Sequence, residues 1–168
     1  MLDKIKATIA TIGSDKVSLA GLAFAGQDFS GMNLKKANLS RTNFEKANLQ
    51  KAVLSETILE WANLQEADLT EADCSKAKMF DANLQRATLV SCNLKEAYLG
   101  KVDLRHANLK NADLSKAQLH FADLRDANLE GVKMEGIDLR WVRYNDETKW
   151  PHEDFDPDLA GAIFYVRE

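Results

Sequence analysis

Large apolar residues recur at every fifth position from Leu19 to Tyr144, and a smaller residue stands two positions before each of them. Each large residue is the centre of a five-residue unit. The register holds through 26 units without an insertion; 19 centres are Leu, and the position two before the centre is Ala in 15 units. Such an uninterrupted short period is typical of a solenoid, in which each unit buries its apolar side only by stacking on its neighbours.

A period of five fits neither an α-helix nor a flat strand. At about 100° per residue a helix would spread the centres around its surface, and a flat strand repeats every two residues. Within one unit the small residue and the centre are two positions apart, so both lie on one face of an extended segment. The other residues must turn the chain. The pattern therefore predicts a coil filled by Leu and Ala, with backbone hydrogen bonds between successive coils.

The unit Ala-(Asn/Asp)-Leu-x-x, as in residues 47–51 and 107–111, resembles that of the pentapeptide-repeat proteins. The resemblance covers about three quarters of the chain. It implies an all-β solenoid, a right-handed quadrilateral β-helix with four units per coil, and 26 units would then make about six and a half coils. The closing segments 144–151 and 155–163 are similar to tails of cyanobacterial members.

Both ends of the chain carry segments that could cover the open ends of such a tube, where strand edges and the core would be exposed. We expect an N-terminal capping helix in residues 1–16, the repeat in 17–144 and a C-terminal helical cap in 145–168. Asp156 and Pro157 have the pattern of a helix start. The first helix is indicated by apolar residues at helical spacing, Leu2, Ile5, Ile9 and Ile12, before Gly13. Candidates to seal the far end are Trp150, Phe155, Leu159, Ile163, Phe164 and Val166.

The net charge of −4 is unevenly distributed, with +1 in residues 1–16, 0 in 17–144 and −5 in 145–168. A neutral repeat lacks the basic stripe of a nucleic-acid binder. The sequence also has no apolar run that fits a secretory leader or a membrane span. We therefore expect a cytoplasmic protein that binds neither nucleic acid nor a membrane.

Catalytic chemistry is not indicated, and we expect no enzyme, no cofactor and no metal site. A Leu-filled tube offers flat walls rather than a pocket with converging groups. His106, His120 and His152 belong to no nucleophile or metal motif. Cys74 is a centre and Cys92 occupies a small-residue position, so both are expected to point inward. Asn or Asp before many centres, such as Asn63, is expected to stack between coils and bond nearby backbone groups.

One wall of the predicted tube departs from this pattern. With four units per coil, centres twenty apart share a wall, and the outward aromatic residues of the repeat all fall beside the centres Leu59, Met79, Leu99, Leu119 and Leu139. Before four centres of this wall, the Asn or Asp of the ladder is replaced by Ile58, Lys78, Tyr98 and Gln118. We define the aromatic wall as Ile58, Trp61, Phe80, Tyr98, His120, Phe121 and Trp141.

An exposed aromatic stripe on a polar solenoid is typical of a binding surface, because aromatic residues supply much of the energy of interfaces. We expect a non-enzymatic structural or interaction protein that presents this wall to an unidentified protein partner. Other interpretations are self-association, packing of a terminal cap onto the wall, or aromatics that are only good strand formers. The family resemblance adds a DNA mimic that modulates a type II topoisomerase, although the neutral repeat lacks the acidity of such a mimic. An untested small-ligand or catalytic role for the region of Tyr98, His120 and Phe121 is a third class.

A charge at a centre in the middle of the tube tests the register. In Leu89→Asp an unpaired carboxylate would replace a side chain whose burial is worth about 1.5 to 3 kcal/mol. We expect loss of the cooperative fold, measured by thermal unfolding with circular dichroism. A near-normal melting temperature would contradict the assigned register.

Overall fold

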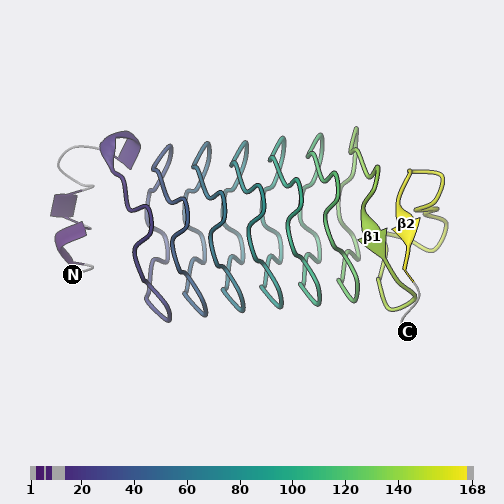
Figure 1. The fold of residues 1–168 in the computed structure, drawn as a ribbon, viewed down its shortest axis with the longest axis horizontal. Coiled ribbons are helices and arrows are strands. Elements are labelled where there is room, and N and C mark those ends of the chain that lie inside the picture. Colours follow the sequence, from purple (N-terminus) through teal and green to yellow (C-terminus); the bar gives the residue numbers. More distant parts are fainter. Residues whose placement is uncertain (1–2, 6, 9–13, 166–168) are drawn as a thin grey trace.

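The computed structural model describes residues 3–5, 7–8 and 14–165. The chain winds into a stack of similar coils, with the two termini at opposite ends of the stack (Figure 1). Within these residues the structure contains the 3₁₀ helix η1 (Ser14–Lys16) and the strands β1 (Arg143–Tyr144) and β2 (Ile163–Phe164). The rest of the repeat is joined by parallel bridges of single residues.

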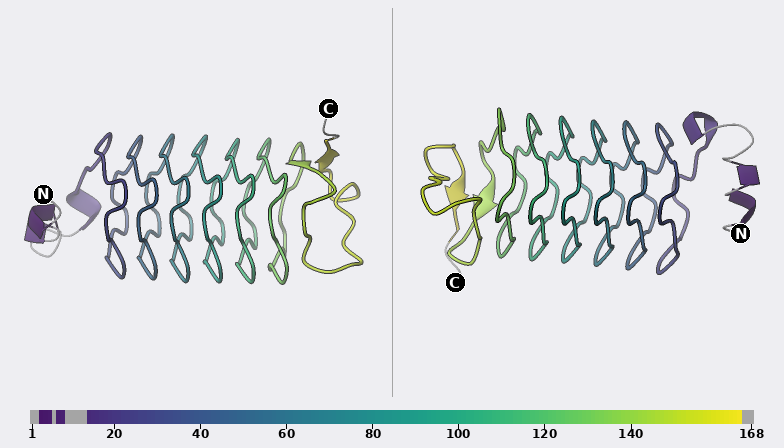
Figure 2. Two further views of the ribbon diagram at one scale, coloured as in Figure 1. Left: turned by 90° about the horizontal axis from the view of Figure 1, so that it is seen from below. Right: turned by 180° about the vertical axis from the view of Figure 1, so that it is seen from behind.

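The bridges join residues twenty positions apart, from Ser18 with Asn38 to Asp123 with Arg143. Four five-residue units therefore make one coil. Backbone hydrogen bonds run between coils, as where the Leu59 N–H donates to the Lys78 carbonyl at 2.7 Å. Figure 2 shows the same stack from two further sides. No loop interrupts the regular coils in these views.

Each unit ends in a tight corner formed by the two residues that follow the centre. The Ala62 N–H donates to the Leu59 carbonyl at 3.1 Å, and Trp61, the third residue of this turn, has φ +57°. A positive φ at that position is the feature of a type II turn, which favours glycine. Gly21, Gly26 and Gly31 hold such corners, but twenty non-glycine residues of the described part of the chain also have positive φ.

The core consists of the centres and the small residues, in agreement with the predicted register. Nearly all of them are buried between Leu34 and Leu129. Cys74 and Cys92 are buried free thiols, which confirms the prediction that both point inward. A hydrogen bond with Cys74, together with burial, raises the pKa of the Cys92 thiol.

The predicted Asn ladder is also present. Asn83 Nδ2 donates to Asn63 Oδ1 at 3.2 Å, and Asn63 Nδ2 donates to Asn43 Oδ1 at 3.2 Å. The Asn63 Oδ1 atom also accepts the N–H of Gln65, two residues along the chain. The first two bonds join the side chains of successive coils and the third satisfies a backbone N–H at the corner, so the role of Asn63 is structural.

The structure describes only part of the predicted N-terminal capping helix. Residues 3–5 and 7–8 are helical, and the half-buried Ile5 packs against the core. Leu2, Ile9, Ile12 and Gly13 lie outside the described residues. The cap therefore stays a prediction.

The predicted C-terminal helical cap is wrong for the described residues 145–165, which form turns and strand β2 but no helix. Asp156 Oδ1 does accept the N–H groups of Asp158 and Leu159, at 3.0 and 3.1 Å, as an N-cap would. Gly161 then takes φ +88°, and the chain leaves the turn before a helix can develop. Strand β2 pairs in parallel with β1, Arg143 opposite Ile163.

One additional residue enters the register after β1. Asn128 pairs with Lys149, twenty-one positions along, whereas the preceding bridges join residues twenty apart. Trp150 consequently takes the place of a centre. Its ring lies 5.4 Å from that of Tyr144 and 5.0 Å from that of Phe155, between ring centroids. These residues pack on the end of the core.

The other residues predicted to seal the C-terminal end of the tube are exposed or lie outside the described residues. Leu159 is 87% exposed, and Ile163 and Phe164 are also exposed, so none of the three is buried over the core. The Phe164 ring does contact Tyr144, with 5.3 Å between centroids. Val166 lies outside the described residues. None of the described helical segments is long and apolar enough to cross a membrane.

The left-handed corners generate a prediction about exposed positions. Arg86 is an exposed corner residue with φ +58°. A β-branched residue adopts this conformation poorly, so we expect Arg86→Val to lower the free energy of unfolding by about 1 to 2 kcal/mol. In the control Arg86→Gly the backbone strain disappears, and we expect unchanged or higher stability. Chemical denaturation measures both, and equal effects of the two substitutions would contradict the role of the corner.

Candidate functional site

The residues of the aromatic wall occupy three positions of the five-residue unit. Ile58 and Tyr98 stand before their centres, Phe80 and His120 follow theirs, and Trp61, Phe121 and Trp141 occupy corners. The five aromatic residues are 39% to 57% exposed, whereas Ile58 and His120 are half-buried. The structure therefore places the aromatic side chains on one outer surface, as the sequence predicted.

The wall is divided into parts rather than forming one continuous stripe. Phe121 and Trp141 stack with 6.3 Å between ring centroids and an interplanar angle of 11°. Trp61 lies apart from them, because Asp81 and Lys101 occupy the two intervening corners. The Arg41 guanidinium lies over the Trp61 ring, 5.0 Å from its centroid. Phe121 and Trp141 thus form the larger aromatic surface.

A shallow depression lies between Phe80 and His120, where Gly100 has no side chain. Its volume is about 250 Å³ and its lining also includes Tyr98, Lys101, Gln118 and Phe121. A Cβ atom at Gly100 would be 3.2 Å from Phe80 Cδ2, so the Phe80 ring leans over the glycine. Gly100 is not one of the glycines with positive φ. Here glycine provides space and not a special backbone conformation.

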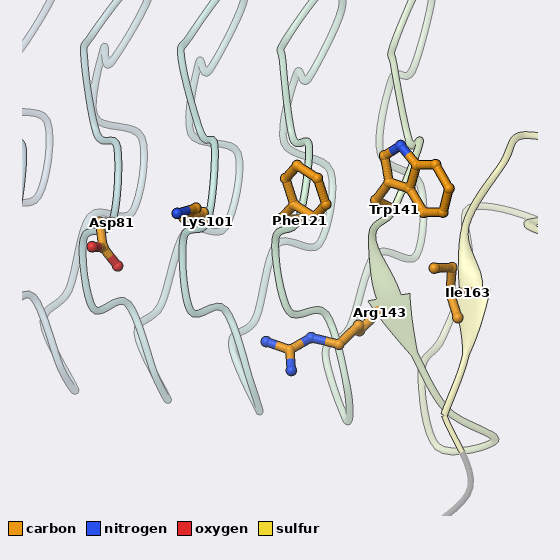
Figure 3. A pocket seen from close by; sticks show the side chains of 6 residues that line it. All are labelled: Asp81, Lys101, Phe121, Trp141, Arg143 and Ile163. Atoms are coloured by element: carbon orange, nitrogen blue, oxygen red, sulfur yellow. The ribbon is translucent and has the colours of Figure 1, made fainter.

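A second depression, of about 490 Å³, adjoins the first and continues to the C-terminal end of the wall. Figure 3 shows its six lining side chains: Asp81, Lys101, Phe121, Trp141, Arg143 and Ile163. Arg143 belongs to β1 and Ile163 to β2, so the tail supplies one side of this depression. A third depression, of about 250 Å³, lies between His120, Phe121, Arg140 and Trp141.

The tail borders the wall without covering it. The Trp141 N–H donates to the Gly161 carbonyl at 3.1 Å, yet the Trp141 side chain is the most exposed of the five aromatics. The interpretation that the C-terminal cap covers the wall is therefore wrong at Trp141 for residues 145–165.

A short ionic cluster lies beside the stacked aromatic rings. Arg140 binds both carboxylate oxygens of Asp138, with Nη2 to Oδ2 at 2.6 Å, and His120 Nδ1 lies 3.5 Å from Asp138 Oδ2. The hydrogen bonds from Arg140, aided by the charge of Arg140 and by His120, lower the pKa of Asp138 to about 2. Asp138 is consequently ionised at neutral pH and fixes the Arg140 side chain beside Trp141.

Sequence reasoning missed Gly100, Lys101, Arg143 and Ile163 as parts of this surface. Gly100 carried a usable signal, because it is the only glycine of the repeat that does not stand at a corner. Ile163 stands twenty positions after its partner Arg143, the spacing of the repeat, but the segment between them no longer follows the five-residue pattern, so its register could not be inferred from the sequence. In the described residues no group of three or more His, Cys, Asp or Glu side chains is arranged to hold a metal ion.

Comparisons with known proteins agree with the five-residue register. A family model described as pentapeptide repeats matches residues 24–60, 57–95 and 92–131. A comparison with curated proteins gave no match. Among solved structures, HetL from the cyanobacterium Nostoc sp. strain PCC 7120, involved in heterocyst differentiation regulation, is 28% identical over 77% of this chain and 76% of its own, with a TM-score of 0.30.

Two other solved structures are similar over longer parts of the chain. Rfr23 from the cyanobacterium Cyanothece 51142 is 24% identical over 88% of this chain and 99% of its own, with a TM-score of 0.34. Full-length QnrB1, a plasmid-mediated fluoroquinolone resistance protein, is 18% identical over 89% and 92%, with a TM-score of 0.36. These low scores add no functional argument, so the family assignment rests on the repeat match.

The ionic cluster generates a prediction about acid titration. In Arg140→Gln we expect the pKa of Asp138 to rise from about 2 toward its ordinary value of 3.8, because the main cause of its shift is removed. A carboxylate with a depressed pKa stabilises the fold above about pH 3.9, and this contribution is lost as pH falls through about 2. Carboxyl-carbon NMR titration measures the change. Arg86→Gln, on another wall, is the control and should leave Asp138 unaltered; a low pKa in both variants would contradict the pairing.

Proposed function

The chain belongs to the pentapeptide-repeat family, and on this premise we propose that it is a non-enzymatic interaction protein that presents the aromatic wall to a protein partner. The observation that carries the proposal is the exposure of five aromatic side chains on one wall, at 39% to 57%. Large exposed apolar patches on otherwise polar surfaces mark interaction sites, and Trp and Tyr are enriched among residues that dominate binding energy.

A rigid support favours this role. Successive coils are joined by main-chain hydrogen bonds, and the centres beneath the wall, Leu59, Leu99 and Leu119 among them, are fully buried. A surface held in its binding conformation loses little conformational entropy on association. We include in the proposal a right-handed tube of about six and a half coils, with terminal segments that cover its ends.

The other walls have a different character, which supports the aromatic wall over the DNA-mimic alternative. Lysines and glutamates one coil apart pair with each other, as in Lys46 with Glu66 at 3.9 Å and Lys51 with Glu71 at 3.6 Å. Such alternation gives a neutral surface, whereas the phosphate backbone of DNA is a dense row of negative charge. The proposed compartment is the cytoplasm, and the free thiols of Cys74 and Cys92 are compatible with a reducing environment.

Affinity capture from native lysate tests the proposal. We expect Trp61→Lys, Phe80→Glu and Phe121→Glu, combined in one folded variant, to lose a protein that the wild type captures. The reason is that the variant replaces three exposed rings of the wall by charges. Quantitative mass spectrometry of the captured proteins is the measurement.

A matched variant places the same side chains on the wall two units away: Gln50→Lys, Val90→Glu and Ser91→Glu. These positions also point outward, so the control carries the same kinds of substitution without touching the rings. It should capture the same protein as the wild type. Identical captures by all three chains would refute the proposal.

A further inference from the structure

We propose that the partner segment that docks on the aromatic wall is acidic and carries an aromatic or aliphatic anchor, with its carboxylates bound near Lys101 and Arg143. This inference rests on the proposed function and specifies the chemistry of the partner. It follows from the distribution of charge around the connected depressions at the C-terminal half of the wall.

Lys101 is placed differently from the corner lysines Lys36, Lys46, Lys51 and Lys76 on other walls, each of which lies within 4.0 Å of a carboxylate. Lys51 and Lys76 lie 3.6 Å from Glu71 and Glu96, the carboxylates one coil along. Lys101 has no carboxylate within 4.0 Å in the part of the chain that the structure describes; its Nζ atom lies 5.5 Å from the centroid of the Phe80 ring. A cation on an aromatic surface keeps its attraction for a carboxylate supplied from outside.

Arg143 supplies a second positive charge with incomplete compensation. Its Nη2 atom lies 3.4 Å from Asp123 Oδ2, but Arg125 binds the same oxygen at 2.7 Å and Arg105 Nε lies 4.0 Å from it. Arg105 also binds Asp103 at 2.7 Å. Three guanidinium groups therefore contact two carboxylates, with Asp126 as a further negative charge near Arg105, and Arg143 shares its carboxylate oxygen with two other guanidinium groups.

The two cations border the same apolar surface. Figure 3 shows the Arg143 side chain extending back along the stack below Phe121, toward the coil that carries Lys101. Both residues line the depression of about 490 Å³, together with Phe121, Trp141 and Ile163. Asp81 is the only carboxylate in that lining. The smaller depression beside Gly100, with Lys101 as its only lysine or arginine, has no carboxylate in its lining.

This arrangement fits a short linear segment. Lys101 and Trp141 occupy corners two coils apart, about 10 Å at the usual spacing of strands, which three or four extended residues span. An aromatic or aliphatic side chain can lie in the apolar depressions while neighbouring Asp or Glu side chains reach Lys101 and Arg143. Anchors in pockets with charges at the rim are a general feature of peptide recognition.

A random dodecapeptide display library, panned against the immobilised full chain, tests this inference. We expect the wild type to enrich peptides that combine Asp or Glu with an aromatic or large aliphatic residue. Binding of these peptides, measured by fluorescence anisotropy, should weaken at least about tenfold in Lys101→Glu, where an attraction becomes a repulsion. The substitution is compatible with the fold, because Glu66 stands at an equivalent corner with φ +57°.

Lys51→Glu is the matched control, since Lys51 has φ +57° at a corner of the wall two units away, on another coil. It should bind the peptides as the wild type does. Enriched peptides without an excess of acidic residues, no enrichment at all, or equal affinity for Lys101→Glu would each overturn the inference. So would a wild-type dimer, detected by sedimentation, that the triple variant of the aromatic wall abolishes.

The experiments distinguish failure of this inference from failure of the proposed function. A protein captured from lysate through the aromatic rings, together with failure of the peptide panning, would keep the interaction role and remove the acidic segment.

Discussion

The left-handed corner is the constraint on which the rest of this structure depends. Each unit must turn the chain after its centre, and the turn requires positive φ at the second residue beyond the centre, as at Trp61 and Lys101. A left-handed conformation costs a non-glycine residue about 1 to 2 kcal/mol. Glycine would avoid this cost, yet most corners carry other residues. The compensation comes from the buried Leu and Ala positions and from the hydrogen bonds between coils.

The same constraint explains why corner residues can carry functional side chains. A corner side chain points away from the tube, so its identity has little influence on the core. Lys, Glu, Arg, Asp, Trp and Phe all occur there with nearly equal φ values, between 56° and 65°. Trp61, Phe121 and Trp141 therefore owe their exposure to the backbone, and their shared wall to the twenty-residue spacing of the bridges.

The sequence was sufficient to predict the coil and the inward residues, because both depend only on a fixed local period. The wall that carries the aromatics also required four units per coil, which the family resemblance implied. The tail was predicted incorrectly. Asp156 and Pro157 give a local helix signal, but the turn ends at Gly161 and the chain then pairs with β1, twenty positions earlier, which a local signal does not reveal. The orientation of the Lys101 side chain could not be predicted either. Asp81, one coil away, and the Phe80 ring are both potential neighbours of its ammonium group. The Phe80 ring leans over Gly100, and Lys101 lies over that ring.

The twenty-residue coil also restricts how the length of this protein can change in evolution. Loss or gain of a whole coil would move the aromatic side chains along the axis and leave them on the same wall. Loss of a single five-residue unit between Trp61 and Phe121 would instead rotate everything that follows by one wall, and would separate Trp61 from the stacked pair of Phe121 and Trp141. The composition and core would be almost unchanged by such a deletion, while the surface would be divided between two faces. Selection on the wall therefore acts on the chain in steps of twenty residues, although the fold itself tolerates steps of five.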